Sequence, residues 1–173
     1  MTGSAIVEAG PATARSAAFV RLADGHLDES YRLAHAILGN RTDAEDATHD
    51  ALVRAWRSWP QLRDHRLFEP WFHRILVNTC RDRLRSASKW HVQDLSAEVA
   101  SVAAASPADA VHDREQIRSA LSRLSPDHRI AVALRYYLDL SIDEIAVRVG
   151  VPAGTVKSRL HEALRQMREG MDR

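Results

Sequence analysis

The segment FEPWFHRILVNTCRDRLR contains a stripe of polar residues at steps of four and three. Its members are Arg74, Asn78, Arg81 and Arg85. In a helix they lie on one side, opposite an apolar half that includes Trp71 and Phe72. Guanidinium groups bind phosphates, and an amide can contact the edge of an unpaired base. The pattern therefore predicts nucleic-acid binding rather than catalysis, and Arg83 adds a further cation nearby.

A second candidate site lies in SIDEIAVRVGVPAGTVKSRLHEAL, which predicts a helix-turn-helix. Ser141 and Glu144 have the spacing of a capping box at the start of a short helix. Gly150 can take the left-handed conformation that ends this helix, and Pro152 suits the start of the next. The second helix would then project its polar side towards a ligand.

The polar side of that second helix has the composition of a groove-reading surface. Its outward positions are Ser158, His161, Glu162 and Arg165, with Lys157 and Arg159 on the flanks. The flanking cations can contact phosphates while the central residues approach base edges. Glu162 is an acceptor that suits the N4 amino group of cytosine. A plain helical hairpin with a solvated charged face is the alternative.

A third segment, TDAEDATHDALVRAWRSW, predicts a helix that starts with a capping box from Thr42 to Glu45. Small and aromatic residues follow one face of this helix until Pro60. The opposite face carries Asp46, His49, Asp50, Arg54 and Arg57. From chemistry alone this polar face is either a protein-binding surface or merely solvated.

The elements that carry these residues are all expected to be helices. Apolar residues recur at three and four apart, and Gly and Pro are scarce, so the chain is predicted to be all-α. The alanine- and serine-rich stretch SAEVASVAAASPADA lacks the large side chains of a core. We therefore expect two small helical domains, at 17–86 and 113–173, joined by a flexible linker at 87–112 and preceded by a disordered tail at 1–16.

Composition excludes several classes of protein. With 24 Lys and Arg against 23 Asp and Glu, DNA binding requires local segregation of charge rather than a basic whole. Cys80 is the only cysteine, which excludes an internal disulfide and predicts a buried small residue. The sequence shows no signal peptide and no run of apolar residues long enough to span a membrane, so a cytoplasmic location without membrane insertion is expected.

The segment from Ser122 to Arg168 resembles region 4 of bacterial sigma factors, especially the extracytoplasmic-function group. The matching segments are Leu124-Ser125-Pro126, Leu134-Arg135-Tyr136-Tyr137, Glu144-Ile145-Ala146 and Gly154-Thr155-Val156-Lys157-Ser158-Arg159-Leu160. The segments DAEDATHDALVRAWRSWPQL and FEPWFHRILVNTCRDRLR resemble sigma region 2. The order of the two regions also fits this family.

This resemblance implies a role for each segment. The helix after the turn would contact the −35 element through Thr155, Lys157, Ser158, Arg159, His161, Glu162 and Arg165. The −10 element would be held by Arg63, Asp64, His65, Arg66, Leu67, Phe68, Arg74, Asn78, Arg81 and Arg85. The polymerase-binding positions would be Asp46, His49, Asp50, Arg54 and Trp56.

The expected function is that of an alternative sigma factor that directs promoter-specific transcription initiation. Its partners would be core RNA polymerase, at the β′ clamp and the β flap, promoter DNA, and an anti-sigma factor. The alternatives are a stand-alone helix-turn-helix regulator that binds duplex DNA without polymerase, and an adaptor that only titrates an anti-sigma factor. An enzyme is disfavoured, since there is no HExxH motif, no Cys/His metal spacing and no glycine-rich phosphate loop. No cofactor, metal or small-molecule substrate is expected.

Overall fold

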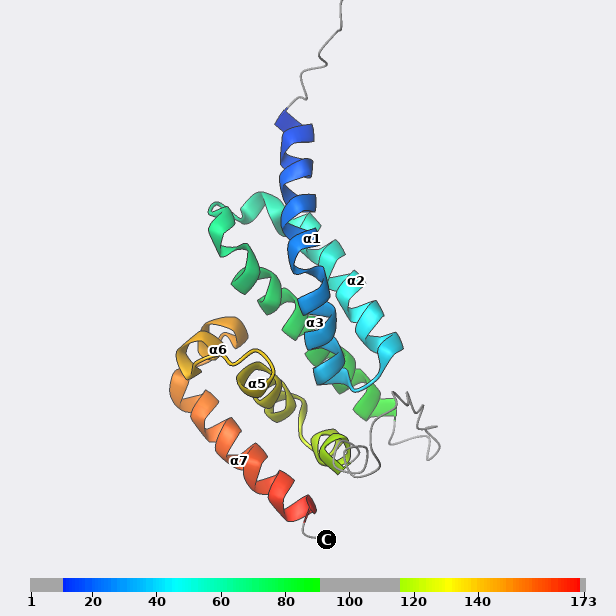
Figure 1. Ribbon diagram of the computed structural model, residues 1–173, viewed down its shortest axis with the longest axis vertical. Coiled ribbons are helices and arrows are strands. Elements are labelled where there is room, and N and C mark those ends of the chain that lie inside the picture. Colours follow the sequence, from blue (N-terminus) through cyan, green and yellow to red (C-terminus); the bar gives the residue numbers. More distant parts are fainter. Residues whose placement is uncertain (1–10, 91–115, 172–173) are drawn as a thin grey trace, which may run out of the picture.

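The computed structural model describes residues 11–90 and 116–171, and every regular element in these ranges is a helix (Figure 1). The elements are α1 (Pro11–Leu38), α2 (Arg41–Ser58), the 3-10 turns η1 (Trp59–Gln61) and η2 (His65–Leu67), α3 (Phe68–Trp90), α5 (Pro126–Tyr136), α6 (Ile142–Val149) and α7 (Ala153–Met171). Residues 116–122 are also helical. The all-α prediction is confirmed.

The turn between α1 and α2 is made by a glycine and an asparagine. Gly39 has φ of 80° and donates its backbone N–H to the carbonyl of His35, which ends α1. Asn40 then caps α2, because its side chain accepts from the backbone N–H of Asp43 at 2.8 Å. The predicted start of this helix at a capping box from Thr42 to Glu45 is therefore wrong, since Asn40 satisfies the free N–H groups two residues earlier.

The N-terminal module, α1 to α3, packs around a face of small side chains on α2. The fully buried members of that face are Ala44, Ala47, Ala51 and Ala55. Side chains this small let α1 and α3 approach α2 closely on either side. Aromatic residues fill the end of the module, where Phe19, Trp59, Phe68 and Phe72 lie with neighbouring ring centroids 5.4 to 6.0 Å apart.

The C-terminal module contains the predicted helix-turn-helix. Ser141 and Glu144 form a complete capping box at the start of α6, as the sequence indicates. Gly150 ends α6 with φ of 70°, and α7 begins at Ala153, directly after Pro152. Both turn predictions are confirmed, and they fix α7 against α6 and α5.

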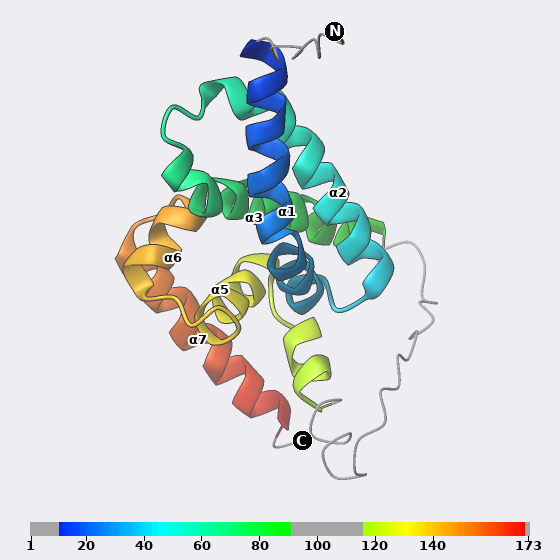
Figure 2. The ribbon, with the colours of Figure 1, turned by 45° about the horizontal axis from the view of Figure 1, so that its top comes forward.

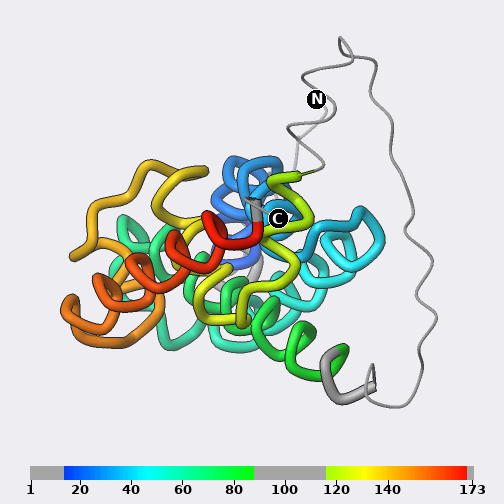
Figure 3. The backbone as a smooth tube through the Cα atoms, turned by 90° about the horizontal axis from the view of Figure 1, so that it is seen from below, coloured from blue at the N-terminus to red at the C-terminus, as the bar shows by residue number. Residues whose placement is uncertain are grey.

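The two modules pack against each other. α3 contacts both α5 and α6, and α1 contacts α5. Figure 2 shows α6 beside the first part of α3, and the view in Figure 3 places the yellow-to-red helices directly against the blue-to-green ones. The buried apolar side chains of both modules form a single cluster. The sequence predicted two domains but not this contact between them.

The observed helix ends change the predicted boundaries. α1 begins at Pro11, so residues 11–16 of the expected tail are helical, while residues 1–10 lie outside the described part of the chain. α3 continues to Trp90, so residues 87–90 of the expected linker belong to a helix. The rest of that linker, 91–112, lies outside the described residues.

Cys80 is fully buried in α3, as predicted. Burial raises the pKa of its thiol to about 12, which keeps the sulfur protonated and unreactive at neutral pH. Among the helices of residues 11–90 and 116–171, none is both long and apolar enough to cross a membrane.

Replacing Gly150 with alanine is expected to destabilise the protein by roughly 1–2 kcal/mol, because an L-residue is strained at this left-handed φ. A Cβ there would also lie 3.2 Å from Nη2 of Arg74. Urea denaturation measures the change. Gly154→Ala is the matched control, since its Cβ would meet nothing within 4 Å, and it should leave the free energy of unfolding unchanged or slightly higher. Equal stability of Gly150→Ala and the wild type would contradict the turn assignment.

Candidate nucleic-acid and polymerase interfaces

The helix after the turn, α7, presents most of its predicted contact residues to solvent. Lys157, Ser158, His161 and Arg165 are exposed, while Val156, Leu160 and Ala163 are buried against the rest of the module. The hydroxyl of Ser158 donates to the carbonyl of Gly154 at 3.1 Å. Thr155 and Arg159 are half-buried. The predicted polar face of this helix is therefore present, but Arg159 lies at its edge and faces α5.

Glu162 and Arg165 form a closed ion pair on the exposed face of α7. Nε and Nη2 of Arg165 donate to the two carboxylate oxygens of Glu162 at 3.0 and 2.6 Å. Gln166 donates to the same carboxylate at 2.7 Å, and Glu169 accepts from Nη1 of Arg165 at 2.5 Å. The hydrogen bonds from Arg165 hold the pKa of Glu162 at about 2. Glu162 is therefore not the free acceptor for cytosine that its residue type suggested.

The predicted stripe on α3 exists, and it faces the C-terminal module. Arg81 donates to Oδ1 of Asn78 at 2.5 Å, so these two side chains form one unit. Nε of Arg81 also lies 2.7 Å from Oδ1 of Asp127, in the first turn of α5. Arg85 reaches the other oxygen of Asp127 at 3.5 Å, and Arg74 lies beside Gly150. The structure thus brings the stripe together and partly covers Asn78 and Arg81 with the second module, while the side chains of Arg74 and Arg85 remain exposed.

The conformation of the loop before α3 is stabilised by the carboxylate of Asp64 and by the stacking of His65 on Trp59. Asp64 accepts from the backbone N–H of Arg66 at 3.0 Å and forms a two-pronged ion pair with its guanidinium. These hydrogen bonds lower the pKa of Asp64. The ring of His65 stacks on Trp59 with centroids 4.4 Å apart, and the side chain of Leu67 is exposed. Arg63 is also exposed.

Phe68 does not belong to this loop surface. Its side chain is 1% exposed and packs in the aromatic cluster at the first position of α3. The prediction that it contacts bases is wrong, because its ring fills the core between α1 and α3.

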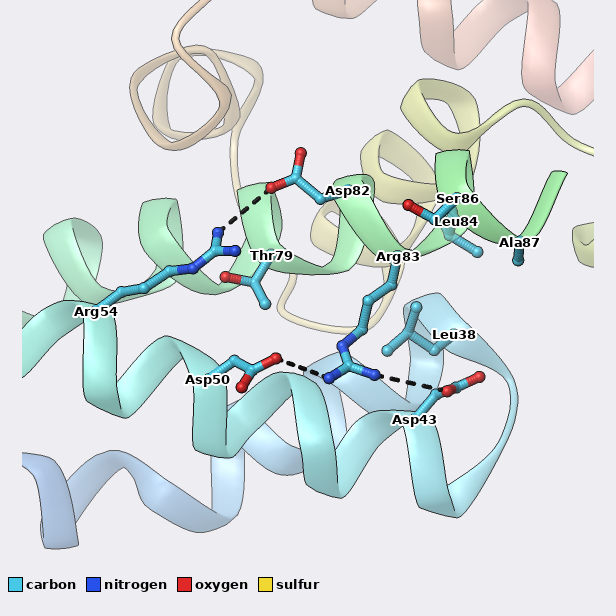
Figure 4. Close-up of a pocket in the computed structure, with 10 residues that line it drawn as sticks. All are labelled: Leu38, Asp43, Asp50, Arg54, Thr79, Asp82, Arg83, Leu84, Ser86 and Ala87. Carbon is cyan, nitrogen blue, oxygen red and sulfur yellow. Dashed lines mark hydrogen bonds and ion pairs between the residues drawn. The ribbon is translucent and has the colours of Figure 1, made fainter. Parts of the chain in front are cut away.

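The polar face of α2 is an acidic surface that α3 partly neutralises (Figure 4). Arg83 reaches from α3 to three carboxylates, at 2.7 Å from Asp50, 3.5 Å from Asp46 and 3.8 Å from Asp43. Arg54 pairs with Asp82 at 3.3 Å, and an open pocket of about 370 Å³ lies between these groups. Arg83 therefore faces α2 and not a nucleic acid, which corrects its expected role.

The remaining predicted residues of α2 are exposed. His49 is accessible, and Trp56 is 46% exposed although its ring lies 5.1 Å from that of Phe19. The five predicted polymerase-binding residues therefore share one side of α2, where carboxylates alternate with a basic and an aromatic group.

Three residues that form the contact between the two modules were not predicted from the sequence. Asp127 looks like an ordinary first-turn acid of α5, while Glu69 and Arg148 are each isolated in the sequence but form an ion pair at 2.6 Å. Only the folded contact between the modules reveals these roles. The Glu162–Arg165–Glu169 cluster, in contrast, has the three- and four-residue spacing that predicts helical ion pairs.

Comparison with known proteins gives two family matches. Residues 22–89 match the family model for sigma-70 region 2, and residues 114–167 match that for sigma-70, region 4. The chain is 35% identical to the ECF RNA polymerase sigma factor SigE of Mycolicibacterium smegmatis over 97% of its own length and 67% of that protein's. It is 33% identical to SigL, an ECF RNA polymerase sigma factor of Mycobacterium tuberculosis, over 92% of both chains.

Among solved structures, the fold resembles the sigma factor RpoE in a complex with the anti-sigma factor NepR from Bartonella quintana. The TM-score is 0.69 at 24% identity, and the match covers 89% of this chain and 96% of that one.

The ion pair on α7 is testable by titration. We expect the Glu162 carboxyl to remain ionised down to about pH 3, since its pKa is held at about 2. Arg165→Gln should return the pKa towards 4.5, whereas Arg168→Gln, which removes a neighbouring cation with no contact to Glu162, should not. Side-chain carboxyl shifts followed by NMR between pH 7 and pH 3 would measure this. A wild-type Glu162 that titrates near 4.5 would contradict the ion pair.

Proposed function

The chain belongs to the extracytoplasmic-function (ECF) sigma factors of the sigma-70 family, and from this premise we propose how its own residues bind polymerase and promoter. As a member of this family it is a non-enzymatic factor that directs RNA polymerase to promoters. The match of residues 22–89 to region 2 decides against the stand-alone regulator, which needs only the helix-turn-helix.

The acidic side of α2 is the proposed docking surface for core polymerase, at the β′ clamp. It is formed by Asp46, His49, Asp50, Arg54 and Trp56. Asp46 and Asp50 carry negative charge that would attract a basic partner, and Trp56 offers an exposed aromatic surface beside them. Arg83 of α3 forms ion pairs with both carboxylates, at 3.5 Å from Asp46 and 2.7 Å from Asp50, and these contacts fix their positions.

The −10 element is the proposed ligand of α3 and the loop before it. Asn78 would contact an unpaired base, and Arg74, Arg81 and Arg85 would follow the phosphates. The loop residues Arg63, Asp64, His65, Arg66 and Leu67 would receive a base that is extruded as the duplex opens, at a cost of a few kcal/mol. The fixed Asp64–Arg66 pair and the exposed side chain of Leu67 support this role.

The −35 element is the proposed ligand of α7, bound in the major groove. Thr155, Lys157, Ser158, Arg159, His161 and the Glu162–Arg165 pair would make the contacts. Because the net charge of the whole chain is only +1, its affinity for free DNA should be modest. Tethering of both modules to polymerase, region 4 at the β flap, would supply the rest through effective concentration.

Two further assignments rest on the family. We propose that residues 91–112 connect the two modules as a linker, and that the protein acts in the cytoplasm, where it meets polymerase. A relative of the same fold forms a complex with an anti-sigma factor, and we propose such a partner for this chain.

Run-off transcription on a library of randomised promoters tests the function. Core RNA polymerase with the wild-type chain should yield specific transcripts that core polymerase alone does not produce. The promoters of these transcripts define the preferred −35 and −10 sequences. Asp50→Arg should abolish most of this transcription, because it replaces an anionic docking residue with a cation and repels Arg83.

Asp24→Arg on α1 is the matched control, with the same change of charge at an exposed position outside the proposed interface. It should retain wild-type transcription. No specific transcripts with the wild-type chain would refute the function, and full activity of Asp50→Arg would refute the docking surface alone.

A further inference from the structure

Arg165 of α7 is held between two carboxylates of its own helix. Glu162, one turn towards the N-terminus, accepts from Nε of Arg165 at 3.0 Å and from Nη2 at 2.6 Å. Glu169, one turn towards the C-terminus, accepts from Nη1 at 2.5 Å. Because Glu162 makes a two-pronged ion pair and Glu169 a single contact, the guanidinium is held towards the N-terminal side of its own position.

The direction in which Arg165 is held matters for promoter binding. In a helix-turn-helix, residues at the N-terminal end of the second helix contact base edges in the major groove. Arg165 lies seven residues after Ser158 on the same exposed face, which is about 10 Å further along the helix. Its side chain therefore approaches the bases only when it lies back over the preceding turn, where the pair with Glu162 holds it.

Glu162 does not occupy the edge of the guanidinium that pairs with guanine. Its carboxylate takes the edge formed by Nε and Nη2, so the fork of Nη1 and Nη2 points away from it. Such a fork pairs with O6 and N7 of guanine in the major groove. Glu169 holds Nη1, but its side chain is 59% exposed against 36% for Glu162. A guanine can therefore displace Glu169 without breaking the pair with Glu162.

The carboxylate of Glu162 is itself fixed by a third side chain. Nε2 of Gln166 donates to Oε1 of Glu162 at 2.7 Å, and the same oxygen accepts from Nη2 of Arg165. This second contact restricts the rotamers of Glu162 and, through it, those of Arg165. A guanidinium that is already held in place loses less conformational entropy when it binds a base. The arrangement therefore favours one base-contacting geometry of Arg165 over the many that a free arginine samples.

We propose that Glu162 is a positioning residue that directs Arg165 to a guanine in the −35 element. The proposal rests on the proposed function, in which α7 binds this element in the major groove. Glu162 acts through Arg165 and selects the base without contacting it. Glu169 has the opposite effect, because it holds Nη1 from the C-terminal side and competes with the base for the fork.

Promoter selection with core RNA polymerase and the full chain tests this proposal. The templates are randomised only in the −35 element, and each sequence is linked to a barcode in the transcribed region. Arg165→Ala should lower a preference for guanine at one position by roughly 10- to 100-fold, the range of a bidentate base contact. Glu162→Gln should lower the same preference by about fivefold, because a neutral amide offers one acceptor oxygen in place of two.

Glu169→Gln is the matched control, since it removes the same charge from the same arginine on the same helix. It should keep the preference for guanine. Equal losses of preference in Glu169→Gln and Glu162→Gln would overturn the proposal, because the effect would then come from charge alone. The proposal would also be overturned if Arg165→Ala left every base preference unchanged. Thermal denaturation followed by circular dichroism verifies that the variants are folded.

A double variant separates positioning from a direct contact or a structural role. Glu162→Gln combined with Arg165→Ala should give the same base preferences as Arg165→Ala alone, because Glu162 acts only through Arg165. A further change of preference in the double variant contradicts the positioning role. Failure of the proposed function would appear as no specific transcripts with the wild-type chain. Failure of this proposal alone would leave those transcripts intact, with the preference for guanine unchanged in Glu162→Gln.

Discussion

Asp127 connects three elements through one carboxylate, and the arrangement of the two modules depends on it. The residue lies in the first turn of α5, where the free N–H groups of the helix favour a negative charge. Arg159 fixes the same carboxylate to α7, which holds the helix-turn-helix against α5. Arg81 then attaches this assembly to α3. One anion thus stabilises a module and also positions it over its neighbour.

Segregation of charge explains how a chain with a net charge of only +1 forms one acidic surface and one basic surface. α2 carries the acidic side and α3 the basic side, and Arg83 crosses between them to the carboxylates of α2. The buried alanine face of α2 brings the two helices close enough for this contact. Anionic and cationic surfaces on adjacent helices suit a factor that must bind a protein and DNA at the same time.

Local patterns in the sequence predicted the local structure well. The helical periodicity, the Ser141–Glu144 capping box, the turn at Gly150 and the burial of Cys80 all depend on neighbours within a few residues. Predictions failed where two neighbouring residues can each cap the same helix, or where tertiary packing determines whether a side chain is buried. Asn40 caps α2 in place of Thr42, and Phe68 joins the core instead of the loop.

The contact between the modules was not predictable from the sequence. Asp127 lies 46 residues from Arg81, and Glu69 lies 79 residues from Arg148, so no periodic pattern relates them. The sequence identified most residues of the candidate interfaces because their types and helical faces are local properties. Whether those faces are accessible depends on how the modules dock, which is a property of the whole fold.

The distance between the modules in the free chain tests the docking of α5 and α7 against α3 most directly. Spin labels at Arg57→Cys on α2 and Arg168→Cys on α7 would occupy exposed positions, while the buried Cys80, with its pKa raised to about 12, stays unlabelled. Double electron–electron resonance should give one short, narrow distance distribution, because the ion pairs at Asp127 and Glu69 hold the modules in one arrangement. A broad distribution centred at long distances would contradict the account.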